Sequence, residues 1–374
     1  ATEVPAIIAN GKLKGEIMAL KGMGLIVSVA SYEVISPNTA IWVGTTIVLI
    51  YTLISGLQGS SRVALIKDIL MFVVLVFLGI FFAFHYFDGI GSVMKQIAEI
   101  KPEVLIFPDT GLSLVWYVST VIFMSLGLYL WPYTFLSTYA AKSDKALRKN
   151  TVLMPLYSLM QLFALFIGLT AILVIPGLVG AEGDMALINL VFETFDPWFV
   201  GIIGATGFLA SIVPCSVSII SIGSMITSNI YMPLKPDTSE RKQMNIARLF
   251  AMIAGGICLY LTLNSNGAIV FLQLLSYNFI MQLFPAFIFS LQKNNFITKQ
   301  GAISGIAVGV ALALYSAATG TTLETLFPSL PSFILDINNG LYMLIINLMV
   351  TTVVSLFTNK SLQKTKELEK EIVS

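Results

Sequence analysis

The chain has 374 residues, of which 56% are hydrophobic and only 11% are charged, roughly half the charged fraction of an ordinary soluble domain. Its mean hydropathy of +0.88 is too apolar for a surface in contact with water. One His and two Cys provide no material for a disulfide framework, a zinc site or a His-based catalytic triad. A net charge of +1 removes the electrostatic case for binding nucleic acid. The composition therefore predicts an integral membrane protein that is not an enzyme.

Ten stretches of the chain are long and apolar enough for transmembrane helices, which need about 20 residues each. In chain order they are 15–35, 38–57, 62–86, 112–135, 151–178, 198–230, 245–263, 267–291, 301–319 and 338–357. The first is the weakest because it contains charged residues. Alternation of period two is absent, so the pattern predicts an α-helical bundle. We expect one transmembrane domain over 1–360 and a short charged tail over 361–374.

The start of the chain and its loop charges give two further expectations. Residues 1–10 lack the basic, apolar and cleavage segments of a signal peptide, so we expect N-terminal helices to be missing. If the ten spans alternate, all basic residues except Lys21, Lys95 and Lys101 fall in the loops of one side. The positive-inside rule places that side in the cytoplasm. We therefore expect a multi-pass protein of the plasma membrane with a cytoplasmic C-terminus.

The span 112–135 combines hydroxyl and aromatic side chains with a proline. Pro132 has no N–H and leaves the Leu128 carbonyl without its helical partner, so we expect a helix break that exposes backbone dipoles to a central cavity. The candidate substrate-binding residues here are Ser125, Tyr129, Trp131 and Tyr133. Trp and Tyr near a helix end also serve as interface anchors, and that alternative stays open.

The span 198–230 carries serines on one helical face, with Pro214 between them. Pro214 should break the helix and free the carbonyl of Ala210. That carbonyl, with the hydroxyls of Ser211 and Ser218, can coordinate a cation in a wet cavity. The alternative is that small residues only allow close helix packing and that the serines bond to their own helix.

The span 267–291 contains amide side chains before Pro285, where we expect a third helix break. Gln282 is a further candidate for substrate binding, because amides are unfavourable against lipid. Interhelical hydrogen bonding is the alternative. Asp68 directly follows Lys67, and we interpret the two as a local ion pair. The sequence contains no carboxylate pair for a proton relay and no phosphate-binding glycine loop.

Four blocks, taken together and in order, resemble the sodium:solute symporter family. In 39–70, Ser55-Gly56 stands at the family's Gly-Gly and Lys67-Asp68 at its Thr-Asp. The other blocks are 131–150 with its Ala-Ala-Lys-Ser turn, Asn229-Ile230-Tyr231, and 282–310 with its proline and glycines. Within the family, Trp131-Pro132, Arg148–Asn150, Leu153–Tyr157, Trp198–Gly201 and Ile212–Pro214 are similar to the monocarboxylate permease-like branch.

The resemblance implies a LeuT-type fold of two inverted five-helix repeats, with these spans as the third to tenth core helices plus two more. It implies a secondary active transporter that couples a cation to a small organic solute, either a monocarboxylate or a small amino acid. The family's paired sodium-ligating hydroxyls fall on Val213 and Pro214, which cannot coordinate a cation. Sodium, protons and uncoupled transport therefore stay open, with no other cofactor or metal implied. The expected partners are the small-molecule substrate and the lipid bilayer. Alternatives are a membrane sensor acting through a partner protein and, less favoured, a channel or an intramembrane enzyme.

Overall fold

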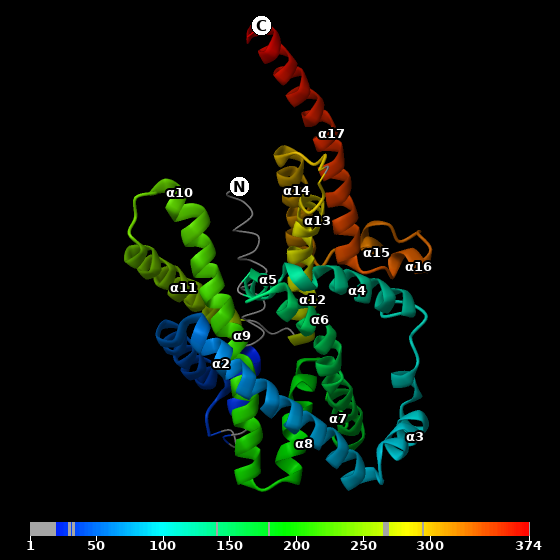
Figure 1. Ribbon diagram of the computed structural model, residues 1–374. Coiled ribbons are helices and arrows are strands. Elements are labelled where there is room, and N and C mark those ends of the chain that lie inside the picture. The colour runs from blue at the N-terminus through cyan, green and yellow to red at the C-terminus, as the bar shows by residue number, and fades with distance from the viewer. Residues whose placement is uncertain are drawn as a thin grey trace. The chain divides into compact units, whose positions relative to one another are not determined.

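The computed structural model describes residues 20–28, 31, 34–139, 141–178, 180–264, 269–293 and 295–373 (Figure 1). Every regular element in this part of the chain is helical. Eight segments are long and apolar enough to cross a membrane, and a shorter apolar segment covers Leu114–Leu130. These nine match the predicted spans from 38–57 onward. Of the span 15–35, residues 20–28 are helical. The prediction of an all-α membrane protein is confirmed.

The helices follow one another closely along the chain. In order they are α2 (Pro37–Phe87), α3 (Ile90–Ile100), η1 (Pro102–Leu105), α4 (Leu114–Gly127), η2 (Leu128–Leu130), α5 (Pro132–Tyr139), α6 (Asp144–Ser158), α7 (Met160–Val174), η3 (Gly180–Met185), α8 (Ala186–Thr194), α9 (Pro197–Ile226), η4 (Thr227–Tyr231), α10 (Met232–Leu234), α11 (Glu240–Leu263), α12 (Ile269–Ile280), η5 (Met281–Leu283), α13 (Phe284–Ser290), α14 (Lys299–Thr319), α15 (Leu323–Leu326), α16 (Ser332–Leu335) and α17 (Asn339–Val373).

Helix α2 is longer than the sequence indicates, because its 51 residues join the predicted spans 38–57 and 62–86. The side chain of Ser36 accepts a hydrogen bond from the Thr39 N–H at its start, and Asp88 ends it in the left-handed conformation with φ 56°. Residues 55–61 contain no proline, so helical hydrogen bonding continues where we expected a loop. The two apolar segments remain separate within this one helix.

The described residues form two compact units. The C-terminal unit contains Phe107–Thr134 and Leu274–Ser374, and the central unit contains Lys12–Ile106 and Phe135–Gln273. In the C-terminal unit α14 and α17 lie side by side (Figure 1), and α17 continues as a helix into the predicted tail. In the central unit α2 packs against α7, α9 and α11.

Two apolar clusters hold the central unit together. One gathers side chains from α2, α7, α8 and α9 and includes Phe82 and Leu190, both without solvent exposure. The other joins residues 20–28 to α2, α9 and α11 and includes Met23, Val48 and Ile219. Side chains of this size each contribute about 1.5–3 kcal/mol when fully buried. These clusters leave one face of α9 outside the core, as described below.

Candidate functional site

A helix interruption lies at the centre of the C-terminal unit. Helix α4 ends at Gly127, a 3₁₀ turn covers Leu128–Leu130, and Trp131 is extended with φ −61° and ψ 125° before α5 begins at Pro132. The pyrrolidine ring favours this arrangement, because proline has no N–H to continue a helix but fits its first turn, and it disfavours the helical conformation in the residue before it. The interruption therefore places backbone polar groups and the side chains of 125–131 at one location.

A second interruption lies against the first. The 3₁₀ turn η5 (Met281–Leu283) separates α12 from α13, directly before Pro285. A Cβ atom on Gly127 would lie 2.6 Å from Met281 Sδ and 3.2 Å from the Tyr277 ring, so only glycine allows this approach. Tyr277, Met281 and Trp131 share one buried apolar cluster. The two interrupted helices thus meet at Gly127.

The structure separates the predicted substrate residues of 112–135 into two kinds. Ser125 and Tyr129 are exposed and lie one helical turn apart, with the Ser125 hydroxyl donating to the Val121 carbonyl at 2.6 Å. Trp131 is only 5% exposed and packs edge-on against Tyr277, with ring centroids 5.2 Å apart. The Tyr133 side chain lies outside the described part of the chain. Ser125 and Tyr129 therefore lie on the surface of the described residues, whereas Trp131 lies inside the buried cluster.

Gln282 is not accessible, contrary to what a direct substrate contact requires. Its side chain has no exposed area. Its amide nitrogen donates to the Asn278 carbonyl at 2.9 Å, and its side-chain oxygen accepts from Asn347 Nδ2 at 3.0 Å. The interhelical alternative explains this geometry, because the carbonyl group faces a neighbouring helix. Helix packing thus accounts for both hydrogen bonds of the Gln282 side chain, and its contact with the substrate stays a prediction.

The helix break expected at Pro214 is absent. Helix α9 is α-helical without interruption over Pro197–Ile226 with Pro214 inside it. Proline removes one helical hydrogen bond, but Ile212, Val213 and Cys215 beside it are all buried, and their packing holds the helix together. The helical geometry changes only at the π-helical segment Thr227–Tyr231.

The predicted cation-binding residues form a stripe on α9. Ala210, Ser211 and Ser218 are all half-buried, and Pro214 between them is exposed. Ser211 and Ser218 are seven residues apart and therefore share a helical face. The Ser211 hydroxyl donates to the Gly207 carbonyl at 3.1 Å. Ser211 and Ser218 are thus partly exposed on this face of α9.

Asp68 belongs to a small polar cluster that the sequence revealed only in part. Its Oδ1 lies 2.7 Å from Lys67 Nζ, which confirms the predicted local ion pair. The Tyr157 hydroxyl on α6 also donates to Oδ1 at 3.1 Å. No local pattern indicates this tyrosine, because it lies 89 positions further along the chain. Asp68 thus has two partners.

Asn338 is a second residue that sequence reasoning missed. It is 7% exposed, and its Nδ2 donates to Thr120 Oγ1 at 2.8 Å, while its Oδ1 accepts from the Gly340 N–H at 2.9 Å. Its own N–H donates to Ser119 Oγ at 2.9 Å. Asn338 therefore ties α4 to the start of α17 and fixes the helix that carries Ser125 and Tyr129.

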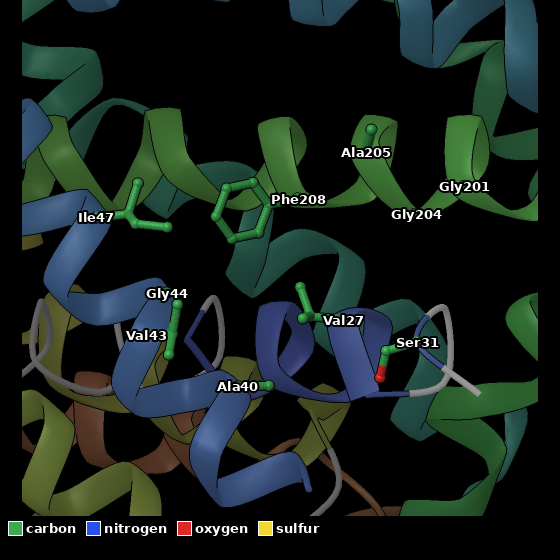
Figure 2. A pocket seen from close by; sticks show the side chains of 10 residues that line it. All are labelled: Val27, Ser31, Ala40, Val43, Gly44, Ile47, Gly201, Gly204, Ala205 and Phe208. Carbon is green, nitrogen blue, oxygen red and sulfur yellow. The ribbon is translucent and has the colours of Figure 1, made fainter. Parts of the chain in front are cut away.

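A groove of about 310 Å³ lies in the central unit. Figure 2 shows its lining residues, which are Val27 and Ser31 together with residues from the first half of α2 and the first half of α9. Among its ten lining residues only Ser31 has a polar side chain. The Ser31 hydroxyl already donates to the Ser28 carbonyl at 2.7 Å and accepts from the Ile35 N–H at 3.1 Å. The groove is therefore apolar and does not match a site for a carboxylate or a cation.

The comparisons with known proteins agree with this architecture. The family model of the sodium:solute symporters matches residues 23–309. The chain belongs to the sodium:solute symporter family. The uncharacterized symporter YhjB of Bacillus subtilis (strain 168) is 43% identical over 345 residues, which are 92% of this chain and 71% of that protein. Family membership and eight apolar helices indicate a multi-pass transporter of the plasma membrane rather than an enzyme.

More distant members of the sodium:solute symporter family have named substrates. A monocarboxylate transport permease protein of Rhizobium johnstonii is 26% identical, over 70% of this chain and 54% of that protein. A sodium/proline symporter of Haemophilus influenzae is also 26% identical, over 73% and 56%. The structure of a Na⁺-coupled sialic acid symporter in a substrate-bound, outward-open state matches with a TM-score of 0.73 and 18% identity, covering 94% of this chain and 74% of that one. This likeness confirms the LeuT-type fold.

Proposed function

We propose that this symporter carries a small organic solute, a monocarboxylate or a small amino acid, together with sodium by alternating access. The observation that carries the proposal is the interrupted helix α4–η2–α5 of a sodium:solute symporter, with Ser125 and Tyr129 exposed on it. Relatives named for monocarboxylate and for proline support both substrate classes, which share one carboxylate.

The substrate carboxylate is met by backbone dipoles and hydroxyl groups. Residues 113–139 contain no charged side chain and no histidine, so no basic residue of this segment neutralises the anion. The N-terminus of α5 carries the partial positive charge of a helix N-terminus and begins at the interruption. Tyr129 supplies a hydroxyl donor beside it, and the Ser125 hydroxyl can do so once it turns away from the Val121 carbonyl. This arrangement suits one carboxylate on a small, otherwise weakly polar solute.

The sodium ion binds at the stripe on α9. Pro214 has no N–H, so the Ala210 carbonyl lacks its usual helical donor and keeps its lone pairs for a ligand. Ser211 and Ser218 lie on the same face, but about 10 Å apart along the uninterrupted helix, so one ion can take a hydroxyl oxygen from only one of them. Val213 and Pro214, which occupy the positions of the family's paired hydroxyls, have no side-chain oxygen. The stripe therefore offers the ion one carbonyl and one serine hydroxyl in place of a hydroxyl pair.

Uptake of labelled pyruvate, lactate and proline into proteoliposomes tests the substrate assignment. Tyr129→Phe and Ser125→Ala should each raise KM about tenfold or more, the loss expected for one hydrogen bond to a charged group. Tyr117→Phe is the matched control, since Tyr117 is an exposed tyrosine three turns earlier on α4. Unchanged KM values in both test variants would remove Ser125 and Tyr129 from the site.

A further inference from the structure

Helices α14 and α17 of the C-terminal unit pack so closely that the contact positions on α14 leave no room for a side chain. Gly301, Gly305 and Gly309 repeat at four-residue spacing on α14. A Cβ atom would lie 1.9 Å from Ser355 Oγ at the first position and 1.8 Å from Thr351 Oγ1 at the second. At the third it would lie 2.1 Å from Gln282 Oε1. This row of glycines lets polar side chains of α17 fit into the backbone of α14.

The face of α17 that fills this contact is polar and fully buried. Asn347 and Ser355 have no exposed area and Thr351 is 1% exposed. The Thr351 hydroxyl donates to Asn347 Oδ1 at 3.0 Å, and Ser355 Oγ accepts from the Thr298 N–H at 3.1 Å. Buried polar groups that are all paired specify one arrangement, because any other leaves them without partners at a high cost. We call the interface formed by these residues and the three glycines the polar seam.

The polar seam reaches the helix interruption through Asn347. Its Nδ2 donates to the backbone carbonyl of Gln282 at 2.8 Å and to the side-chain oxygen of Gln282 at 3.0 Å. Because Thr351 donates to the other amide atom, Nδ2 is directed at Gln282. Gln282 is the central residue of η5. The Asn347 side chain of α17 therefore bonds to both the backbone and the side chain of Gln282 in the interruption.

The interruption at η5 is in turn packed against the one in α4. Met281, the residue before Gln282, contacts Gly127, and Tyr277 packs edge-on against Trp131. Leu344, one turn before Asn347 on α17, joins the same buried cluster. A contiguous series of contacts thus leads from Asn347 through Gln282 and Met281 to the segment that carries Tyr129.

We propose that Asn347 is a positioning residue for substrate binding, which holds the two helix interruptions in register through Gln282. The proposal rests on the proposed function of the 125–131 segment. It adds a determinant of substrate affinity on the last transmembrane helix, a helix that contributes no candidate substrate contact of its own.

Asn347→Leu is the test variant, because leucine has the same number and branching of heavy atoms but cannot donate to either Gln282 oxygen. Ser355→Ala is the matched control, since it removes a buried hydrogen bond at the other end of the same polar seam. Substrate KM, maximal uptake rate and melting temperature are measured for each in proteoliposomes or detergent. We expect Asn347→Leu to raise KM about tenfold and Ser355→Ala to lower only the melting temperature.

A second readout does not depend on transport. With Trp42, Trp116, Trp198 and any tryptophan outside these 374 residues replaced by Phe, Trp131 is the remaining tryptophan, and its emission reports the packing at the interruption. Asn347→Leu should shift this emission and Ser355→Ala should leave it unchanged. If the parent protein shows no uptake, the proposed function fails and the emission alone decides the inference.

The inference is overturned if Asn347→Leu changes neither KM nor Trp131 emission, or if Ser355→Ala changes both equally. The first result would show that the interruption does not depend on Asn347. The second would show that the polar seam contributes only to the overall stability of the protein. If Asn347→Leu does not fold, Thr351→Val replaces it, because this near-isosteric change removes the hydrogen bond that orients Asn347. The same two readouts then apply, with a smaller expected rise in KM.

Discussion

Replacing Gly127 by alanine should separate the two helix interruptions of the C-terminal unit. The new Cβ would lie 2.6 Å from Met281 Sδ, whereas ordinary contacts begin near 3.4 Å, so the buried methionine must move by almost 1 Å. Overpacking of this kind costs about 1–3 kcal/mol. Alanine regains at most about 1 kcal/mol of helix propensity, and less at the last residue of α4. The expected net loss of stability is about 1–2 kcal/mol.

The assay combines thermal unfolding in detergent with substrate uptake in proteoliposomes. Gly127→Ala should lower the melting temperature by about 1–3 °C and raise KM. Gly168→Ala on α7 is the matched control, because nothing lies within 4 Å of a Cβ at that position, and it should keep wild-type stability and kinetics.

A double variant shows whether the Met281 contact is responsible. Met281→Ala alone should cost about 2–5 kcal/mol, as for other buried methionines. In Gly127→Ala/Met281→Ala the new methyl group enters the vacated space, so the combined loss should fall short of the sum by about 1 kcal/mol or more. Strictly additive losses, or a Gly127→Ala protein with wild-type stability and KM, would refute the reasoning.

Ser218→Ala should raise the sodium concentration for half-maximal uptake several-fold without changing the substrate KM at saturating sodium. Ser216→Ala should leave the sodium dependence unchanged, because Ser216 is buried and bonded to its own helix. An equal sodium dependence in both variants would argue against sodium binding at the stripe. Tyr157→Phe should lower stability by less than about 1 kcal/mol, because its partner Asp68 is 42% exposed, and a change in sodium dependence would give the pair a role we do not assign. Asn338→Ala removes two buried hydrogen bonds and should cost about 2–4 kcal/mol; unfolding measurements showing no loss would contradict this.

The sequence was sufficient for the class of fold because the bilayer imposes a length and a hydropathy that can be counted. The sequence was insufficient for predicting helix breaks, because a proline creates only a tendency of the helix to break at that position. Pro132 follows Gly127 and an extended Trp131, and there the helix is interrupted. Pro214 has buried neighbours in Val213 and Cys215, whose packing keeps the helix continuous. Which outcome applies depends on tertiary contacts that no local pattern contains.

The same dependence on tertiary contacts explains why the candidate site could be predicted only in part. Gln282 is a polar residue in an apolar span, and such a residue is equally expected for contact with a substrate and for contact with another helix. Its partner Asn347 lies 65 residues away in the sequence. The glycine spacing at 301, 305 and 309 is visible in the sequence and indicates a close helix contact. The sequence does not indicate which helix fills it. Ser125 and Tyr129 stay predictions, now with the exposure that a substrate contact requires.

Uptake by the intact protein under separate sodium and proton gradients distinguishes sodium symport from the alternatives. Proteoliposomes receive labelled pyruvate, lactate or proline with one gradient imposed at a time. The account predicts saturable uptake of at least one of these solutes that a sodium gradient accelerates and a proton gradient alone does not. Acceleration by protons alone would contradict sodium binding at the stripe on α9. No acceleration by either gradient would contradict symport of these solutes and favour a sensor that acts through a partner.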